Sequence, residues 1–193
     1  MRILCFGDSN TYGYDPRTGS GGRFGPEGRW VDLLAQMTGW QVRNRGENGR
    51  RIPYTPSALA QAQRMLRANA SADLVIVMLG TNDLLQGESV FEISARMELF
   101  LKSIRPLCRN ILLIAPPPLQ RGQWVTEETL LTESAQLGAA YGTLARDLGI
   151  DFADAAQWNV TLCFDGVHFS EDGNLSFAQS LRDHLLRNFI ETL

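Results

Sequence analysis

The stretch Leu74-Val75-Ile76-Val77-Met78-Leu79-Gly80-Thr81-Asn82-Asp83 decides the fold. Its first six residues are apolar without any polar alternation, which is typical of a strand buried on both faces of a parallel sheet. Polar residues follow at once, and the carboxyl ends of parallel strands are where such side chains converge on one crevice. The stretch therefore predicts a central strand with a functional loop after it.

Shorter apolar runs and helical patterns alternate on either side of this stretch. Runs of strand length lie at residues 2–6, 41–44, 110–115 and 150–152. Apolar residues at helical spacing occupy residues 30–37, 59–70, 90–104, 127–148 and 176–190. This alternation is typical of a parallel sheet with helices on both faces. We therefore predict an α/β fold, a three-layer α/β/α arrangement around a flavodoxin-like five-stranded parallel sheet of order 2-1-3-4-5.

The size of the chain predicts its domain organisation. With 193 residues and 44% hydrophobic content, the chain is long enough to form one well-buried core but is short for a protein with two such cores. It contains no internal repeat, low-complexity tract or linker that would separate two regions of different composition. We expect a single domain over residues 1–193.

The net charge and hydropathy pattern exclude several partners. A net charge of -3 provides no basic surface of the kind that nucleic acid or anionic membranes attract. No apolar run approaches the roughly 20 residues that span a bilayer. The apolar run at residues 3–6 ends at Gly7, so we expect no signal-peptide core. We expect a cytoplasmic protein that acts on a small molecule, with no nucleic-acid or membrane partner; the sequence leaves open a homo-oligomer.

The cysteines argue against a structural metal or a disulfide framework. The three of them, Cys5, Cys108 and Cys163, are widely spaced, without a C-x-x-C pair or a neighbouring histidine cluster. We accordingly expect no metal and no other cofactor.

Candidate catalytic residues stand in four polar blocks. Ser9 directly follows the first predicted strand, where it is either a turn or cap residue or a nucleophile that needs an adjacent base. Asp165 and His168 are three residues apart, so the carboxylate can reach the imidazole Nδ1 and leave Nε2 to take a serine proton. The same spacing is also typical of a surface turn. The other histidine, His184, lies in a predicted helix, where we interpret it as a solvated or partly packed residue.

Two further blocks offer hydrogen-bond donors. Asn82 and the backbone N–H of Gly49 could stabilise an oxyanion, because an amide side chain just past a strand and a loop glycine can donate to one oxygen. Each also has an ordinary interpretation, Asn82 as a turn residue and Gly49 as a loop glycine.

The blocks Gly7-Asp8-Ser9-Asn10, Gly46-Glu47-Asn48-Gly49, Gly80-Thr81-Asn82-Asp83 and Asp165-Gly166-Val167-His168 occur in the order found in the SGNH (GDSL-type) hydrolase superfamily, which the chain resembles. Residues 3–13, 77–83 and 116–119 are similar to its arylesterase/acyltransferase branch, although the segment 50–56 is shorter than in that branch's best-known acyltransferase. The resemblance implies Ser9 as nucleophile, His168 as base and Asp165 as its orienter. It implies an oxyanion hole of the Ser9 N–H, the Gly49 N–H and the Asn82 side chain.

The same resemblance implies a serine esterase that cleaves short-chain acyl esters through an acyl-serine intermediate, with acyl transfer to small alcohols also open. Alternatives of the same fold are a carbohydrate acetylesterase and a thioesterase. A different class is a non-catalytic flavodoxin-like binding module, although the chain lacks a phosphate-binding G-x-x-x-x-G-K-[ST] sequence. A metal-dependent phosphoesterase would draw its ligands from Asp8, Asn82, Asp83, Asp165 and His168, but such sites usually use several histidines.

Substrate contacts are expected from Tyr12, Arg50 and Trp124. Arg50 follows the candidate oxyanion glycine, and solvated loop arginines are the alternative interpretation. Trp30 and Phe169 could also line a pocket, although such aromatic residues as often pack in the core. The irregular loops 13–28 and 116–124 follow strands, so both could form walls of the crevice.

Overall fold

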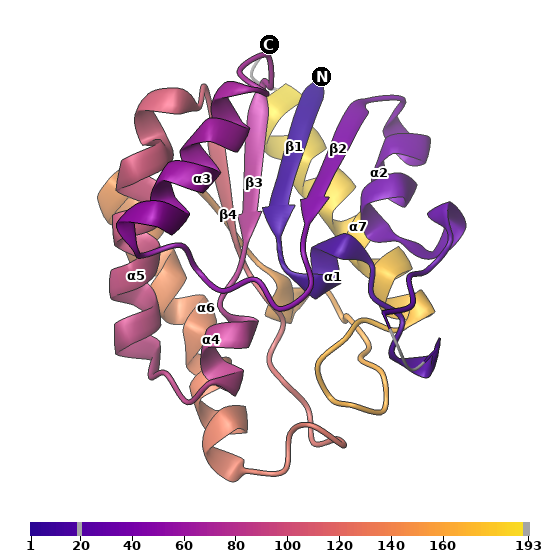
Figure 1. The fold of residues 1–193 in the computed structure, drawn as a ribbon. Helices are drawn as coiled ribbons and strands as arrows, with labels where there is room; N and C mark the ends of the chain where they lie inside the picture. The colour runs from indigo at the N-terminus through magenta and orange to yellow at the C-terminus, as the bar shows by residue number, and fades with distance from the viewer. Residues whose placement is uncertain (19–20, 191–193) are drawn as a thin grey trace.

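The computed structural model describes residues 1–18 and 21–190, which are built around one parallel sheet (Figure 1). Its strands are β1 (Arg2–Gly7), β2 (Gln41–Gly46), β3 (Leu74–Met78), β4 (Ile111–Ala115) and β5 (Asp151–Asp154). They lie in the order β2-β1-β3-β4-β5, and every neighbouring pair is parallel. This confirms the predicted order 2-1-3-4-5.

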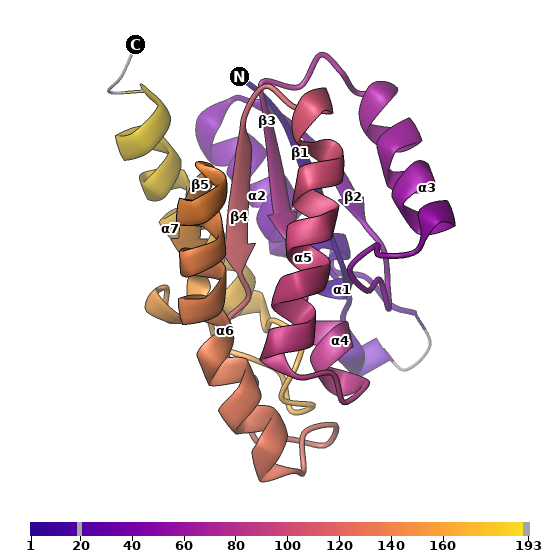
Figure 2. The same cartoon turned by 90° about the vertical axis from the view of Figure 1, so that its left-hand side faces the viewer.

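Helices cover both faces of the sheet, so the predicted three layers are confirmed (Figures 1 and 2). On one face lie α3 (Pro56–Arg67), α5 (Val90–Ile104) and α6 (Glu128–Leu148), and on the other lie α2 (Trp30–Thr38) and α7 (Glu171–Leu185). Two short helices, α1 (Ser9–Tyr12) and α4 (Thr81–Leu85), begin just past β1 and β3. Single turns occupy Pro16–Thr18, Pro26–Gly28, Arg105–Leu107, Ala155–Gln157 and Leu186–Ile190.

Strand β3 is buried throughout, as its unbroken apolar run predicts. Val75 and Val77 pack into the core under α3, α5 and α6, while Ile76 and Met78 pack into the core under α2 and α7. Since successive side chains of a strand point to opposite faces, only a strand covered on both sides needs apolar residues at every position.

Most predicted elements differ from the observed ones by at most three residues at each end, and α7 is the exception. It begins at Glu171 instead of residue 176. Its first turn contains Gly173 and Asn174, which resemble a loop in sequence. Ser170 caps this turn by accepting a hydrogen bond from the Gly173 N–H at 3.0 Å, and the Asn174 side chain accepts from the Trp30 N–H at 3.1 Å. Tertiary contacts therefore hold as helix a segment whose propensity is weak.

Both irregular loops lie near the carboxyl ends of the strands. In the loop 13–28, Tyr14 and Arg23 form an antiparallel bridge, and residues 19–20 lie outside the described residues. The loop 116–124 runs beside residues 164–166, with backbone hydrogen bonds between the two segments. Over residues 1–18 and 21–190, no helix is both long and apolar enough to cross a membrane.

Candidate active site

The structure places Ser9 at the point where β1 gives way to α1. Gly7, the last residue of β1, pairs with Met78 of the neighbouring β3, and α4 with Asn82 follows β3 closely. Ser9 and Asn82 therefore follow adjacent strands at the same edge of the sheet, as the strand order predicts. Asp8 caps α1, because its side chain accepts a hydrogen bond from the Asn10 N–H at 3.0 Å.

Ser9, His168 and Asp165 form a continuous hydrogen-bonded chain. The Ser9 Oγ lies 2.9 Å from Nε2 of His168, and Nδ1 of His168 lies 2.6 Å from Oδ2 of Asp165. All three side chains are buried. The structure thus brings together residues that are 159 positions apart in the sequence, in the arrangement of a nucleophile, a base and an orienting carboxylate.

The Asp165 carboxylate is held in its charged form by its surroundings. Burial by itself raises its pKa, but hydrogen bonds from the His168 ring, the His168 N–H and the Val167 N–H outweigh burial and lower the pKa below its ordinary value. The two backbone donors both bind Oδ1, at 3.0 Å and 2.9 Å, which leaves Oδ2 for the imidazole. A charged carboxylate in this position favours the histidine tautomer with the proton on Nδ1.

Asn10 fixes the distance between the serine and the histidine. Its Nδ2 donates to the Val167 carbonyl at 3.1 Å, and its Oδ1 accepts from the Phe169 N–H at 2.9 Å. The Trp30 indole N–H donates to the Asn10 carbonyl at 2.9 Å. Trp30 and Phe169 are buried in the core, so of the two interpretations that the sequence left open for them, core packing is the correct one. Nothing in the sequence distinguished Asn10 from an ordinary turn residue.

The turn between Asp165 and His168 depends on Gly166, which has a φ of +80°. The Trp124 N–H donates to the Asp165 carbonyl at 3.1 Å, and the Gln120 N–H donates to the Gly166 carbonyl at 3.0 Å. A Cβ on Gly166 would overlap with the Gln120 carbonyl oxygen. The close pairing of the two segments therefore requires glycine for both its dihedral angles and its size.

We expect Gly166→Ala to lower the free energy of unfolding by about 3 kcal/mol or more, because dihedral strain and a backbone clash add together. Gly87 is the matched control, since it also has a positive φ, of +84°, but nothing lies within 4 Å of its Cβ position. Gly87→Ala should cost only about 1–2 kcal/mol. Urea unfolding of both variants measures the difference, and equal losses would mean that the contact with Gln120 contributes nothing.

The residues predicted to form an oxyanion hole lie on three neighbouring segments. Gly49 is in the turn after β2, with a φ of +73°, and the Nδ2 of Asn82 donates to the carbonyl of the next residue, Arg50, at 3.0 Å. One amide hydrogen of Asn82 is used in this way, and the amide group has a second. Within the part of the chain that the structure describes, the N–H groups of Ser9 and Gly49 donate to no protein acceptor. Their role as donors to a substrate oxygen stays a prediction.

Aromatic rings flank His168 on two sides. The Tyr14 ring centroid lies 4.6 Å from that of the imidazole, and the Trp124 ring meets the imidazole edge-on at 5.2 Å. Trp124 is half exposed, as a wall residue must be. Tyr14 was not among the predicted substrate contacts, and its place two residues after Tyr12 was the one sequence feature that pointed to it.

The other two predicted substrate contacts have different surroundings. The Arg23 guanidinium carbon lies over the Tyr12 ring, 4.3 Å from the ring centroid. Contact between Tyr12 and a substrate stays a prediction. The Arg50 guanidinium turns back to the carbonyl groups of Gly7 and Arg45 at the ends of β1 and β2. The structure therefore gives the Arg50 side chain internal partners, and its predicted contact with a substrate stays a prediction.

Asp8 and Asp83, two of the side chains considered as metal ligands, have structural partners of their own. Asp83 accepts from the Ile52 N–H at 3.1 Å and pairs with Arg51 at 3.3 Å, while Asp8 caps α1. In residues 1–18 and 21–190, no three His, Cys, Asp or Glu side chains are grouped so as to hold a metal ion. The carboxylates considered for a metal-dependent phosphoesterase thus have separate structural partners.

Asp8 is buried beside the site, and burial raises its pKa to about 6, against the hydrogen bond from the Asn10 N–H, which lowers it. Between about pH 4 and pH 6 the folded protein then keeps a proton that the unfolded chain has released. The free energy of unfolding therefore falls as the pH rises through this window.

We expect this group to make the protein about 2 kcal/mol less stable at about pH 7.5 than at about pH 4.5. Asp8→Asn keeps a capping oxygen and cannot titrate, so its stability should depend less on pH by that amount. Urea unfolding of both proteins at the two pH values measures the effect. If both lose the same stability with rising pH, Asp8 has an ordinary pKa.

A parallel α/β/α sheet with a Ser–His–Asp chain at the carboxyl ends of its strands defines a protein of the serine hydrolase class. The chain belongs to the GDSL-like Lipase/Acylhydrolase family, whose model matches residues 5–175. Comparison with curated protein sequences found no match.

Solved structures extend this relationship. The native aryl esterase of M. smegmatis superposes with a TM-score of 0.85 at 27% identity, covering 95% of this chain and 97% of the esterase. Est24, a carbohydrate acetylesterase from Sinorhizobium meliloti, superposes with a TM-score of 0.85 at 25% identity, covering 98% of this chain and all of Est24 (100%). The chain is therefore similar over nearly its whole length to aryl and carbohydrate acetyl esterases.

Proposed function

We propose that this protein is a serine esterase that cleaves short-chain acyl esters, aryl and acetyl esters among them, through an acyl-serine intermediate. The observation that carries the proposal is the chain from Ser9 Oγ to His168 Nε2 at 2.9 Å and from His168 Nδ1 to Asp165 at 2.6 Å. Membership of the acylhydrolase family supports it.

In the first half of the reaction, the Ser9 Oγ attacks the ester carbonyl carbon while Nε2 of His168 takes the hydroxyl proton. Asp165 stabilises the imidazolium that forms. The carbonyl oxygen becomes an oxyanion, which the N–H groups of Ser9 and Gly49 and the Asn82 amide stabilise. The carbon–oxygen bond to the alcohol breaks, and the alcohol leaves with the proton from His168.

In the second half, water enters and gives its proton to His168 as its oxygen attacks the acyl-serine carbonyl. The intermediate collapses, the carboxylic acid leaves, and the proton returns to Ser9. A small alcohol in place of water would produce a new ester, so acyl transfer uses the same groups.

Two aromatic rings beside the base are placed to contact the substrate. Tyr14 and Trp124 stand within ring contact of His168, at 4.6 Å and 5.2 Å between centroids, and restrict the space beside it. We assign both as substrate-contact residues.

The test is a panel of p-nitrophenyl esters from acetate to palmitate, measured with and without a chelator. We expect acetate and butyrate to be cleaved far faster than palmitate, and the chelator to leave the rates unchanged. A preparation that cleaves none of the esters contradicts the proposal, and activity that disappears with the chelator indicates a metal-dependent reaction instead.

A second candidate is the removal of acetyl groups from carbohydrates, which the similarity to Est24 favours. Release of acetate from an acetylated xylo-oligosaccharide, compared with p-nitrophenyl acetate at equal concentration, separates the two substrate classes. A higher kcat/KM for the sugar ester would make the carbohydrate acetylesterase the better description.

A further inference from the structure

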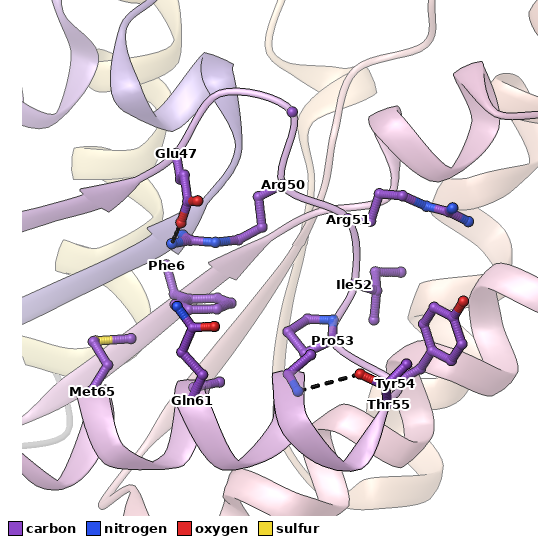
Figure 3. Close-up of a pocket in the computed structure, with 13 residues that line it drawn as sticks. Phe6, Glu47, Arg50, Arg51, Ile52, Pro53, Tyr54, Thr55, Gln61 and Met65 are labelled. Atoms are coloured by element: carbon purple, nitrogen blue, oxygen red, sulfur yellow. Dashed lines mark hydrogen bonds and ion pairs between the residues drawn. The ribbon is translucent and has the colours of Figure 1, made fainter.

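The Arg50 side chain joins the ends of two strands to the turn that contains Gly49. Its Nη1 donates to the Gly7 carbonyl of β1 at 2.7 Å and to the Arg45 carbonyl of β2. Its Nη2 donates to Glu47 at 2.6 Å, the ion pair drawn as a dashed line in Figure 3. The guanidinium also lies 4.3 Å from the centroid of the Phe6 ring.

The Arg50 backbone forms hydrogen bonds with two parts of the candidate oxyanion hole, the turn that contains Gly49 and the Asn82 side chain. Its N–H donates to the Glu47 carbonyl at 3.2 Å, which closes the turn around Gly49. Its carbonyl accepts the hydrogen bond from Asn82 Nδ2 at 3.0 Å. One residue therefore closes the turn that presents the Gly49 N–H and orients the Asn82 amide.

We propose that Arg50 is the positioning residue of the oxyanion hole: its guanidinium anchors the turn to β1 and β2, so that the Gly49 N–H and the Asn82 amide stay aimed at the developing oxyanion. This proposal rests on the esterase function proposed above. Oxyanion donors stabilise the transition state because they are held in position before the reaction begins. A role in holding them explains why the charged Arg50 side chain points toward the strand ends and not toward solvent.

The bonds of Arg50 require a guanidinium specifically. Its planar group donates to Gly7, Arg45 and Glu47 in different directions while its face lies against Phe6. A lysine ammonium carries the same charge but neither the planar fork nor the stacking face. Arg50→Lys is therefore expected to restore little of what Arg50→Ala loses.

A hollow of about 400 Å³ adjoins the guanidinium, bounded by the segment 47–55, helix α3 and the Phe6 ring (Figure 3). Gln61 and Met65 of α3 line its far side. Removal of the Arg50 side chain extends this hollow to the vacated site. A free guanidinium ion from solution can then reach the carbonyl groups that Arg50 bound.

The first test compares Arg50→Ala with the wild type on p-nitrophenyl acetate. We expect kcat to fall on the order of 10²-fold with KM changed by no more than about threefold, because oxyanion donors act in the transition state. Guanidinium chloride at tens of millimolar should restore part of the kcat of Arg50→Ala. Urea at the same concentration, which has a similar shape and no charge, should not.

Arg64→Ala is the matched control, since Arg64 is an exposed arginine of α3, and it should keep the wild-type kcat and show no response to guanidinium. A kcat of Arg50→Ala within twofold of the wild type, or a loss confined to KM, overturns the positioning role. A loss of kcat that guanidinium does not relieve, in a variant whose thermal melting is unchanged, also contradicts the positioning role of Arg50.

A second measurement does not depend on activity. Hydrogen exchange of peptides covering residues 47–52 should be faster in Arg50→Ala than in the wild type or Arg64→Ala, and guanidinium should slow it again. Unchanged exchange overturns the proposal even if the wild type cleaves no ester. Faster exchange in a protein without esterase activity would instead contradict only the proposed function.

Discussion

Ser9→Ala is expected to abolish ester hydrolysis, with kcat for p-nitrophenyl acetate reduced on the order of 10⁶-fold. Without the Oγ there is no atom to form the acyl intermediate, and the 2.9 Å hydrogen bond to His168 has lost its donor. Losing a nucleophile removes nearly the whole advantage of a catalytic triad, because its members act as a unit.

The same variant should not react with a fluorophosphonate probe, while the wild type should gain one label that mass spectrometry locates on Ser9. Ser71→Ala is the matched control: Ser71 is an exposed serine near the opposite end of the sheet, just before β3, and its loss should change neither readout. Retained hydrolysis or labelling in clean Ser9→Ala protein would refute Ser9 as the nucleophile.

The second large effect is expected of Asp165→Asn, with kcat reduced on the order of 10⁴-fold. The N–H groups of Val167 and His168 both donate to Oδ1, so the asparagine oxygen must occupy that position. Its NH₂ group then faces Nδ1 of His168, at the place of the 2.6 Å bond to Oδ2. Because this NH₂ is a donor, Nδ1 becomes an acceptor and the proton moves to Nε2. The imidazole can then no longer take the proton of Ser9.

Steady-state kinetics on p-nitrophenyl acetate and the rate of fluorophosphonate labelling should fall together in this variant. Asp147→Asn, at an exposed aspartate near the end of α6, is the control and should be fully active. A loss below about tenfold would show that Asp165 does not set the tautomer.

The sheet was predictable because strand burial leaves a direct trace in the sequence. Strand β3 has no polar residue and occupies the centre of the sheet. Strand β2 is an edge strand, in which the exposed residues Gln41, Arg43 and Arg45 alternate with half-buried ones. Because this strand has no continuous apolar run, the prediction ended it at residue 44, two residues before its observed end at Gly46. Helices α1 and α4 were not among the predicted elements, because four and five residues are too few to show a helical period.

The amino-acid sequence by itself determined the α/β/α fold and the four polar blocks, because periodicity and residue chemistry are properties of local sequence. The strand order followed from the rule for right-handed crossovers between parallel strands, and the structure confirmed it. Only the tertiary structure decided how the blocks are joined. Asn10 links the serine to the histidine loop, Tyr14 and Trp124 enclose His168, and Arg50 turns inward. The physical reason is that a long side chain such as that of Arg50 has several rotatable bonds, and its direction depends on which acceptors converge around it. One of those acceptors, the Gly7 carbonyl, lies 43 positions away in the chain at the end of β1, so no local pattern records where it meets Arg45 and Glu47.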